Sequence, residues 1–257
     1  SGIEEAKIAA VELGIEVIPG IEFSANHGEL GLHILGYGID IKNSALLAAS
    51  EKMRLSRIER AKEMVKRLAA QGFKISYENV ATRARGGMVM RPHIAFEILE
   101  NPENEGILGG LHTKGDFIKN FLVSGKPAYV ESRDLNSEQA IGIIHGAKGV
   151  AVWSHPAVHF PETFDGLENT LTELATLGLD GVEVFNSSHT ESAVRFLHEL
   201  ARKHNVLLTA GSDFEVEPKT DVSSGGPRGV GDYQTYSFAT DEIIPRLEKA
   251  MAGASGS

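Results

Sequence analysis

Short apolar runs alternate with amphipathic segments along the second half of the chain. The apolar runs lie at 149–153, 181–185 and 206–210. The segments in which apolar residues recur every three or four positions lie at 137–147, 167–177, 190–204 and 241–251. The short runs predict buried strands and the longer segments predict helices. Their alternation predicts a parallel α/β sheet, either open or closed into a barrel.

The first part of the chain has the same kinds of element in a different order. Residues 3–13 predict a helix that ends at Gly14, and two apolar runs at 15–23 and 30–37 predict buried strands. A parallel α/β fold normally begins with a strand. We therefore expect that Ser1 is not the true start of the folded unit.

Residues 44–125 show only helical periodicity. A long amphipathic helix is predicted at 44–71, and it is followed by shorter ones at 77–83, 92–100 and 114–123. Residues 101–110 are rich in glycine and proline and predict a loop. The pattern therefore indicates an all-helical insertion at 44–125 in an α/β domain formed by 1–43 and 126–257.

Composition narrows the classes of function. The formal net charge of −10 disfavours binding of long nucleic acid, although bound cations can still attract a small phosphorylated substrate. The chain has no cysteine, which excludes disulfides and thiolate ligands, but it has ten histidines. It shows neither a membrane-spanning run nor a signal peptide, so we expect no membrane association and a cytoplasmic location. Its oligomeric state is not predicted.

Polar groups that can bind metal lie at the ends of the predicted strands. They are Glu22, His155, Glu183, Asn186 and Asp213, and His33 lies inside the second predicted strand. Each is also explained singly as a helix cap, a turn residue or a core histidine. Functional side chains gather at the carboxyl ends of parallel strands, so the set together predicts a metal site. The spacing of Glu22 and His33 places them on adjacent strands.

Several longer motifs are more specific. They are IPGIEFS at 18–24, HILGY at 33–37, RPHIA at 91–95, PAYV at 127–130, VAVWSHP at 150–156, GVEVF at 181–185 and GSDF at 211–214. In this order the chain resembles the PHP (polymerase and histidinol phosphatase) superfamily, in its TrpH-like branch of metal-dependent phosphoesterases and nucleoside 3′,5′-bisphosphate phosphatases. The resemblance implies a distorted (β/α)7 barrel with a helical insertion, and two or three divalent ions, manganese first, with iron, zinc or magnesium as alternatives.

The resemblance also implies roles for individual residues. The implied metal ligands are Glu22, His33, His155, Asp213 and Glu215. Arg91 resembles an arginine that binds the substrate phosphate, and Arg91 and Asp213 are the candidate catalytic residues. His93 and His189 are further candidates for substrate binding.

Two departures from the family pattern affect this site. The His-x-His motif and the second ligand motif with which the family opens are absent from this sequence. The resemblance therefore implies that a strand–helix–strand unit of roughly 40 residues belongs before Ser1. Glu215 stands where the family usually has histidine, and glutamate also binds hard metals.

These features predict hydrolysis of a small nucleotide by metal-activated water. The substrate would be a nucleoside 3′,5′-bisphosphate or AMP, or the end of a short oligoribonucleotide. The alternatives are a histidinol-phosphate phosphatase and a catalytically impaired module of the same family. A sugar-phosphate isomerase or aldolase is disfavoured because no lysine lies at a predicted strand end.

Overall fold

The computed structural model of this chain describes residues 2–84, 86–132, 135–160, 163–214 and 229–256. The chain forms two compact units, which we describe separately. The sheet unit comprises Ser1–Leu47 and Asp134–Ser257, and the helical unit comprises Ala48–Arg133. In the part of the chain that the structure describes, no helix has the length and apolar character needed to cross a membrane.

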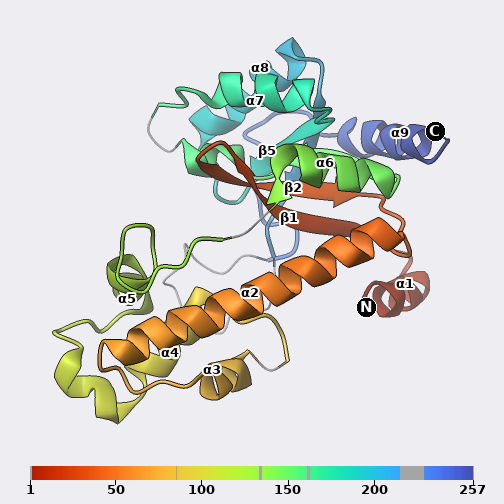
Figure 1. The fold of residues 1–257 in the computed structure, drawn as a ribbon. Coiled ribbons are helices and arrows are strands. Elements are labelled where there is room, and N and C mark those ends of the chain that lie inside the picture. The colour runs from red at the N-terminus through yellow and green to blue at the C-terminus, as the bar shows by residue number, and fades with distance from the viewer. Residues whose placement is uncertain (1, 85, 133–134, 161–162, 215–228, 257) are drawn as a thin grey trace. The chain divides into compact units, whose positions relative to one another are not determined.

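The sheet unit is built on a six-stranded mixed sheet (Figure 1). Its strands are β1 (Gly20–His27), β2 (Leu30–Tyr37), β3 (Leu135–Asn136), β4 (Val150–Trp153), β5 (Gly181–Asn186) and β6 (Leu207–Gly211). They lie in the order β3-β1-β2-β4-β5-β6. β2 is antiparallel to both of its neighbours, whereas the other pairs are parallel. The predicted parallel arrangement is confirmed for β4, β5 and β6.

The sheet unit also contains helices. They are α1 (Gly2–Leu13), α6 (Ser137–Gly146), α7 (Leu167–Thr176), α8 (Glu191–Lys203), α9 (Ile243–Gly256) and the 3-10 helix η2 (Pro156–His159). α6 packs against β1, β2 and β4, while α8 packs against β5 and β6. Every residue of β4 and β5 is buried, as expected for parallel strands between helices. α9 extends beyond its predicted end at 251.

The β1–β2 hairpin has two different faces. Phe23, Leu32 and Ile34 are almost fully buried. Gly36 continues this buried side, and a Cβ atom there would come within 3.0 Å of the Ile144 side chain on α6. This face is therefore closed by α6, and any side chain larger than hydrogen at position 36 would have to displace Ile144.

The opposite face of the hairpin is only partly covered. Leu35 and Tyr37 pack with Val150, Val152 and Leu247, so α9 covers one end of this face. Further along, the same face carries partly open polar positions. The alternation of side chains along both strands thus separates an apolar face from one that can hold polar groups.

The predicted position of β1 was wrong. A strand was expected at 15–23, but β1 begins at Gly20 and continues to His27. Pairing with β2 fixes these limits, because the two strands are joined by a short turn in which Gly28 has a φ of 60°. Ile15 is 60% exposed, so its apolar run does not form a buried strand. Glu22 therefore lies inside β1 and does not follow it.

The helical unit has a core of its own. Its elements are α2 (Ser44–Ala70), which begins at the end of the first sheet-unit segment, α3 (Tyr77–Arg83), α4 (Arg91–Leu99), η1 (Pro102–Ile107) and α5 (Lys114–Phe121). Leu68, Ile98 and Phe117 are fully buried in one cluster. Residues 102–107 form a 3-10 helix where a loop was predicted, and Asn101 caps it by accepting the N–H of Glu103.

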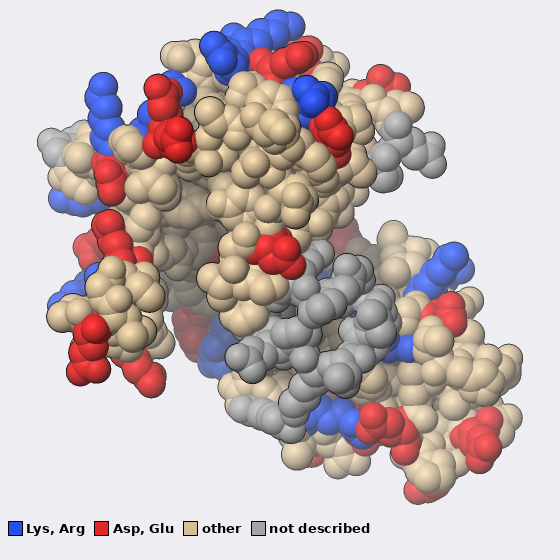
Figure 2. Space-filling view, turned by 180° about the vertical axis from the view of Figure 1, so that it is seen from behind, with Lys and Arg blue, Asp and Glu red and all other residues tan. Residues whose placement is uncertain are grey.

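Charged side chains of both signs are interspersed over the face of the molecule drawn in Figure 2. Along α2, Glu51 pairs with Arg54 and Glu59 pairs with Lys62. Exposed pairs of this kind add little stability. Among the residues coloured in that view, no broad basic surface interrupts the mixed pattern.

Replacing Phe117 with alanine is expected to lower the free energy of unfolding of the helical unit by about 3–5 kcal/mol. Phe117 is fully buried, and its ring centroid lies 5.5 Å from that of Phe73 and 4.7 Å from that of Phe121. Truncation would leave a cavity among these rings. Chemical denaturation measures the change. The half-exposed Leu55, replaced with alanine, is the control and should change the stability much less. Equal effects of the two substitutions would contradict this packing.

Candidate metal centre

Among the described residues, one group of metal-capable side chains converges, and it consists of Glu22, His33 and His155. One ligand atom from each lies within 4.8 Å of the others. His33 Nδ1 is 2.8 Å from Glu22 Oε1 and 3.1 Å from His155 Nε2. His155 Nε2 is 3.7 Å from the same Glu22 oxygen. The structure therefore brings three of the predicted ligands together.

The register of the strands explains this convergence. Ser24 pairs with His33 and Leu35 pairs with Glu22, so Glu22 and His33 are diagonal neighbours on one face of the hairpin. β4 lies on the other side of β2, and the Ser154 N–H donates to the His33 carbonyl at 3.0 Å. His155 comes next along the chain and reaches the same place from the end of β4.

The main chain at His155 adopts an unusual conformation. Its φ of 32° and ψ of 51° fall in the left-handed region, which costs a residue with a side chain about 1–3 kcal/mol. The His155 N–H donates to Glu183 Oε2 at 2.8 Å. The same oxygen accepts Ser154 Oγ at 3.1 Å and Asn186 Nδ2 at 3.0 Å. A single carboxylate oxygen thus fixes the turn that follows β4.

The cluster is electrostatically coupled. The imidazoles of His155, 3.7 Å away, and then of His33, 2.8 Å away, hold the pKa of the Glu22 carboxyl far below its usual range, against the effect of burial. Burial by itself lowers the pKa of His155, but the nearby Glu22 carboxylate and the charges of Glu183 and Asp213 outweigh it, so that the pKa of His155 is raised. A positive charge is therefore favoured where these side chains meet.

The residues of the cluster fit a divalent cation. One carboxylate oxygen and two imidazole nitrogens form a donor set typical of first-row divalent metals. The side chains of Glu22 and His33 are each 41% exposed, so an ion can reach them from solution. His155 directs Nε2 toward the cluster, while its Nδ1 is buried and has no hydrogen-bond partner among the described residues. This orientation leaves Nε2 available as the ligand atom.

Asp213 lies at the end of β6, as the sequence predicted. It is exposed, has a φ of 55°, and its charge contributes to the raised pKa of His155. Asp213 is therefore within electrostatic reach of the cluster, although it is outside the converging group found among the described residues. Glu215 lies outside the residues that the structure describes. The ligand roles of both residues stay predictions.

The predicted site residues leave out two groups beside the cluster, the buried Glu183 and the partly buried His159. Glu183 was recognised as metal-capable, but one of its oxygens is used for three hydrogen bonds. His159, in η2, has its ring centroid 5.9 Å from that of His155. Burial, with smaller contributions from His155 and His33, lowers the pKa of His159 to about 4. The only sequence signal for Glu183 was an acidic residue inside an apolar strand. We find no sequence signal for His159.

The predicted substrate-binding residues lie in different environments. His189 is buried after β5, and its Nδ1 donates to the Val184 carbonyl at 2.9 Å. Arg91 and His93 belong to the helical unit, in the first turn of α4, where His93 Nδ1 accepts the Met90 N–H at 3.0 Å. Their roles in binding a substrate stay predictions.

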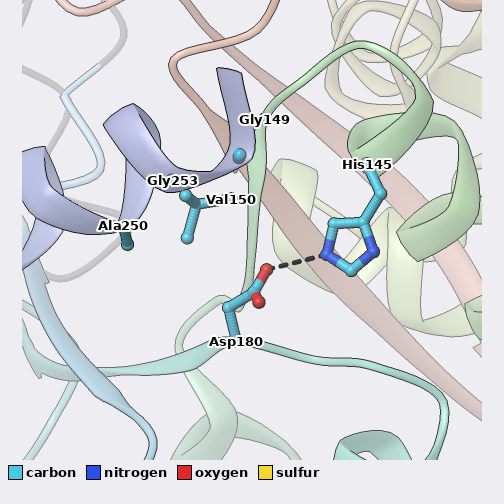
Figure 3. A pocket seen from close by; sticks show the side chains of 7 residues that line it. His145, Gly149, Val150, Asp180, Ala250 and Gly253 are labelled. Carbon is cyan, nitrogen blue, oxygen red and sulfur yellow. Dashed lines mark hydrogen bonds and ion pairs between the residues drawn. The ribbon is translucent and has the colours of Figure 1, made fainter. Parts of the chain in front are cut away.

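A cavity of about 460 Å³ lies at the other ends of the strands (Figure 3). Val150, which begins β4, and Asp180, which precedes β5, line it together with residues of α9. In Figure 3 the ring of His145 points toward Asp180, and His145 Nε2 is 2.8 Å from Asp180 Oδ2. No residue of the metal cluster lines this cavity, so the two are separate features.

The His145–Asp180 pair is expected to stabilise the sheet unit more at low pH than at high pH. The hydrogen bond with Asp180 raises the pKa of His145. Because the pKa of His145 is higher in the folded than in the unfolded state, the stabilisation is complete below the unfolded-state pKa of about 6.5. It is lost as the pH rises through the folded-state pKa. Because both side chains are more than a third exposed, the effect should not exceed about 1 kcal/mol.

The measurement compares the free energy of unfolding of the wild type and His145→Gln at about pH 5.5 and pH 8.5, on either side of the ordinary histidine pKa. The difference between the two proteins should be larger at the lower pH. The exposed His112, replaced with glutamine, is the control and should leave the pH dependence unchanged. The same difference for His145→Gln at both pH values would contradict the ion pair.

Comparison with known proteins finds relatives that match most of the chain. No family model matches the chain. It is 30% identical over 214 residues to a 5′-3′ exoribonuclease of Haemophilus influenzae, covering 83% of this chain and 75% of that protein. It is also 30% identical over 214 residues to a 3′,5′-nucleoside bisphosphate phosphatase of Chromobacterium violaceum, covering 83% of this chain and 72% of the relative.

A solved structure has the same fold. An amidohydrolase of Chromobacterium violaceum, with bound sulfate and no metal, superposes with a TM-score of 0.77 and 28% sequence identity. The match covers 97% of this chain and 82% of the other. The sequence and fold comparisons therefore both match over most of the chain.

Proposed function

The chain belongs to the PHP superfamily of metal-dependent phosphoesterases, and on that premise we propose that it releases phosphate from a small nucleotide. The favoured substrates are a nucleoside 3′,5′-bisphosphate and AMP. The observation that carries the proposal is the convergence of Glu22, His33 and His155 in the sheet unit. A carboxylate and two imidazoles in contact supply the donors that a metal-dependent hydrolase requires.

These three residues would hold one of two or three divalent ions, with manganese favoured. Asp213 and Glu215 would complete the ligand set. Bound divalent ions supply Lewis-acid polarisation of the phosphoryl oxygens and a water of lowered pKa. The chain itself orients the ligand atoms: the hairpin sets Glu22 relative to His33, and the turn after β4 directs His155 Nε2 toward both.

Other residues would bind the substrate. We assign the phosphate to Arg91, because a guanidinium offers a planar pair of donors that matches two phosphate oxygens. His93, in the same first turn of α4, would contribute a second polar contact. His189 is buried and binds the main chain of β5, so it would act indirectly, by holding the loop after β5 in place. The helical unit would then be the insertion that supplies substrate recognition.

Charge and the named relatives support a small substrate. A chain with a net charge of −10 gains little from a long polyanion, whereas bound cations attract a single nucleotide locally. One relative is a 3′,5′-nucleoside bisphosphate phosphatase. Another is a 5′-3′ exoribonuclease, which supports the end of a short RNA as the second candidate substrate.

Phosphate release in the presence of manganese tests the proposal. The substrates are adenosine 3′,5′-bisphosphate, AMP, a short 5′-phosphorylated oligoribonucleotide and histidinol phosphate. We expect the fastest turnover with one of the two mononucleotides and none after chelation of the metal. Fastest turnover of histidinol phosphate would overturn the substrate class. Protein that binds manganese but hydrolyses none of the four would support an impaired module and overturn hydrolysis by this chain.

A further inference from the structure

We infer that Glu183 is a positioning residue that directs His155 toward Glu22 and His33 by holding the main chain where β4 ends. The inference rests on the proposed function, because it gives Glu183 a part in the same metal centre. It concerns a residue that contributes no ligand atom to the converging group found in the described part of the chain.

The hydrogen bonds of Glu183 are concentrated on one oxygen. Oε2 accepts from the His155 N–H, from Ser154 Oγ and from Asn186 Nδ2, at distances of 2.8, 3.1 and 3.0 Å. Ser154 and His155 come directly after the last residue of β4, and Asn186 is the last residue of β5. The carboxylate therefore ties the ends of two neighbouring strands together at the residue that supplies a metal ligand.

His155 needs such a constraint. Its left-handed backbone is unfavourable for a residue with a side chain, so neighbouring contacts have to maintain it. The Val158 N–H binds the His155 carbonyl at 3.1 Å, which fixes the peptide on one side. Glu183 fixes the N–H on the other side. If the second contact is lost, the backbone can relax, and the ring moves with it.

The neighbouring strand is shaped to admit this carboxylate. The register between β5 and β6 shifts between Glu183 and Phe185, and such bulges change the direction of a side chain. Gly211 lies at the end of β6, where a Cβ atom would come within 2.5 Å of Glu183 Oε1. The glycine therefore leaves the room that the Glu183 carboxylate occupies.

A direct role for Glu183 as a metal ligand fits less well. Three donors already bind Oε2, and the residue is 3% exposed, whereas the Glu22 side chain is 41% exposed. Burial raises the pKa of Glu183, whereas the His155 N–H opposes this change. The geometry matches the outer groups of metal sites, which orient a ligand and whose loss typically weakens metal binding by roughly 10- to 100-fold.

Two substitutions separate geometry from charge. Glu183→Ala removes the acceptor, and Glu183→Gln keeps an acceptor oxygen of the same reach without the charge. For Glu183→Ala we expect faster hydrogen exchange of the His155 amide in the metal-free protein, by at least about 10-fold, and a manganese affinity that is lower by roughly 10- to 100-fold. Glu183→Gln should stay within a few-fold of the wild type in both measurements.

The matched control is Glu97→Ala in the helical unit, because Glu97 is also a buried carboxylate, 7% exposed and bonded to Arg83. It should leave the His155 amide and the manganese affinity unchanged. If Glu183→Ala does not fold, Gly211→Ala displaces the carboxylate without removing it and should also lower the manganese affinity.

The outcomes are decisive for Glu183. Unchanged exchange and affinity in Glu183→Ala would overturn the inference. A Glu183→Gln protein with a manganese affinity as low as that of Glu183→Ala would also overturn the inference, because the charge of the side chain and not its position would then matter. A wild type that binds no manganese would count against the proposed function, and the amide exchange would still show whether Glu183 holds His155.

Discussion

Replacing Glu22 with alanine is expected to lower manganese affinity and kcat/KM for nucleotide hydrolysis by more than about 100-fold. Loss of a group that only orients a ligand costs roughly 10- to 100-fold, and Glu22 provides a ligand atom itself. Its carboxylate also contacts both His33 and His155. Without it, the converging group would keep only its two imidazoles. Titration calorimetry and phosphate release measure the two effects.

Glu191→Ala is the matched control for this experiment. Glu191 is an exposed glutamate of the same sheet unit, and it pairs with Arg195 on α8. Its loss should change affinity and turnover by less than about two-fold, since exposed pairs contribute little. If Glu22→Ala behaves like this control, the cluster does not hold the catalytic metal.

Replacing Arg91 with lysine is expected to lower kcat/KM by roughly 10- to 100-fold while manganese affinity stays unchanged. A hydrogen bond to a charged group contributes about 1.5–3 kcal/mol, and each 1.4 kcal/mol corresponds to about a factor of ten in rate. Lysine keeps the charge but loses the planar pair of donors, so it cannot bind two phosphate oxygens in the same way. Steady-state kinetics with calorimetry separates the two effects.

Arg54→Lys provides the control, because Arg54 is a half-exposed arginine of the same helical unit that pairs with Glu51. It should leave kcat/KM within about two-fold of the wild type, as expected for an exposed pair. A normal kcat/KM for Arg91→Lys would assign the phosphate to another residue. A loss of manganese affinity in that variant would instead indicate an effect on the metal centre.

Much of the fold could be predicted because its elements have strong local signals. The helices of both units follow apolar residues at helical spacing, and β4, β5 and β6 follow short apolar runs. The signal failed at β1, where the run beginning at Ile15 looked like a buried strand. Pairing with β2 and the turn at Gly28 set the true limits, and these depend on contacts that a local pattern does not contain.

The site was predictable to a similar degree. Glu22, His33 and His155 could be named, and the spacing of the first two already placed them on adjacent strands. The part of Glu183 could not be foreseen, because it depends on a bulge in β5 and on the absence of a side chain at Gly211. Arg91 was named from the family resemblance alone, since nothing in its local pattern distinguishes it from a surface arginine.

The central claim is that Glu22, His33 and His155 hold a divalent metal ion. Crystals of the protein soaked with manganese, with diffraction recorded near the manganese absorption edge, test it most directly. We predict an anomalous peak in contact with Glu22 Oε1, His33 Nδ1 and His155 Nε2. An occupied manganese site elsewhere, for example beside His145 and Asp180, with no peak at these three atoms would contradict it.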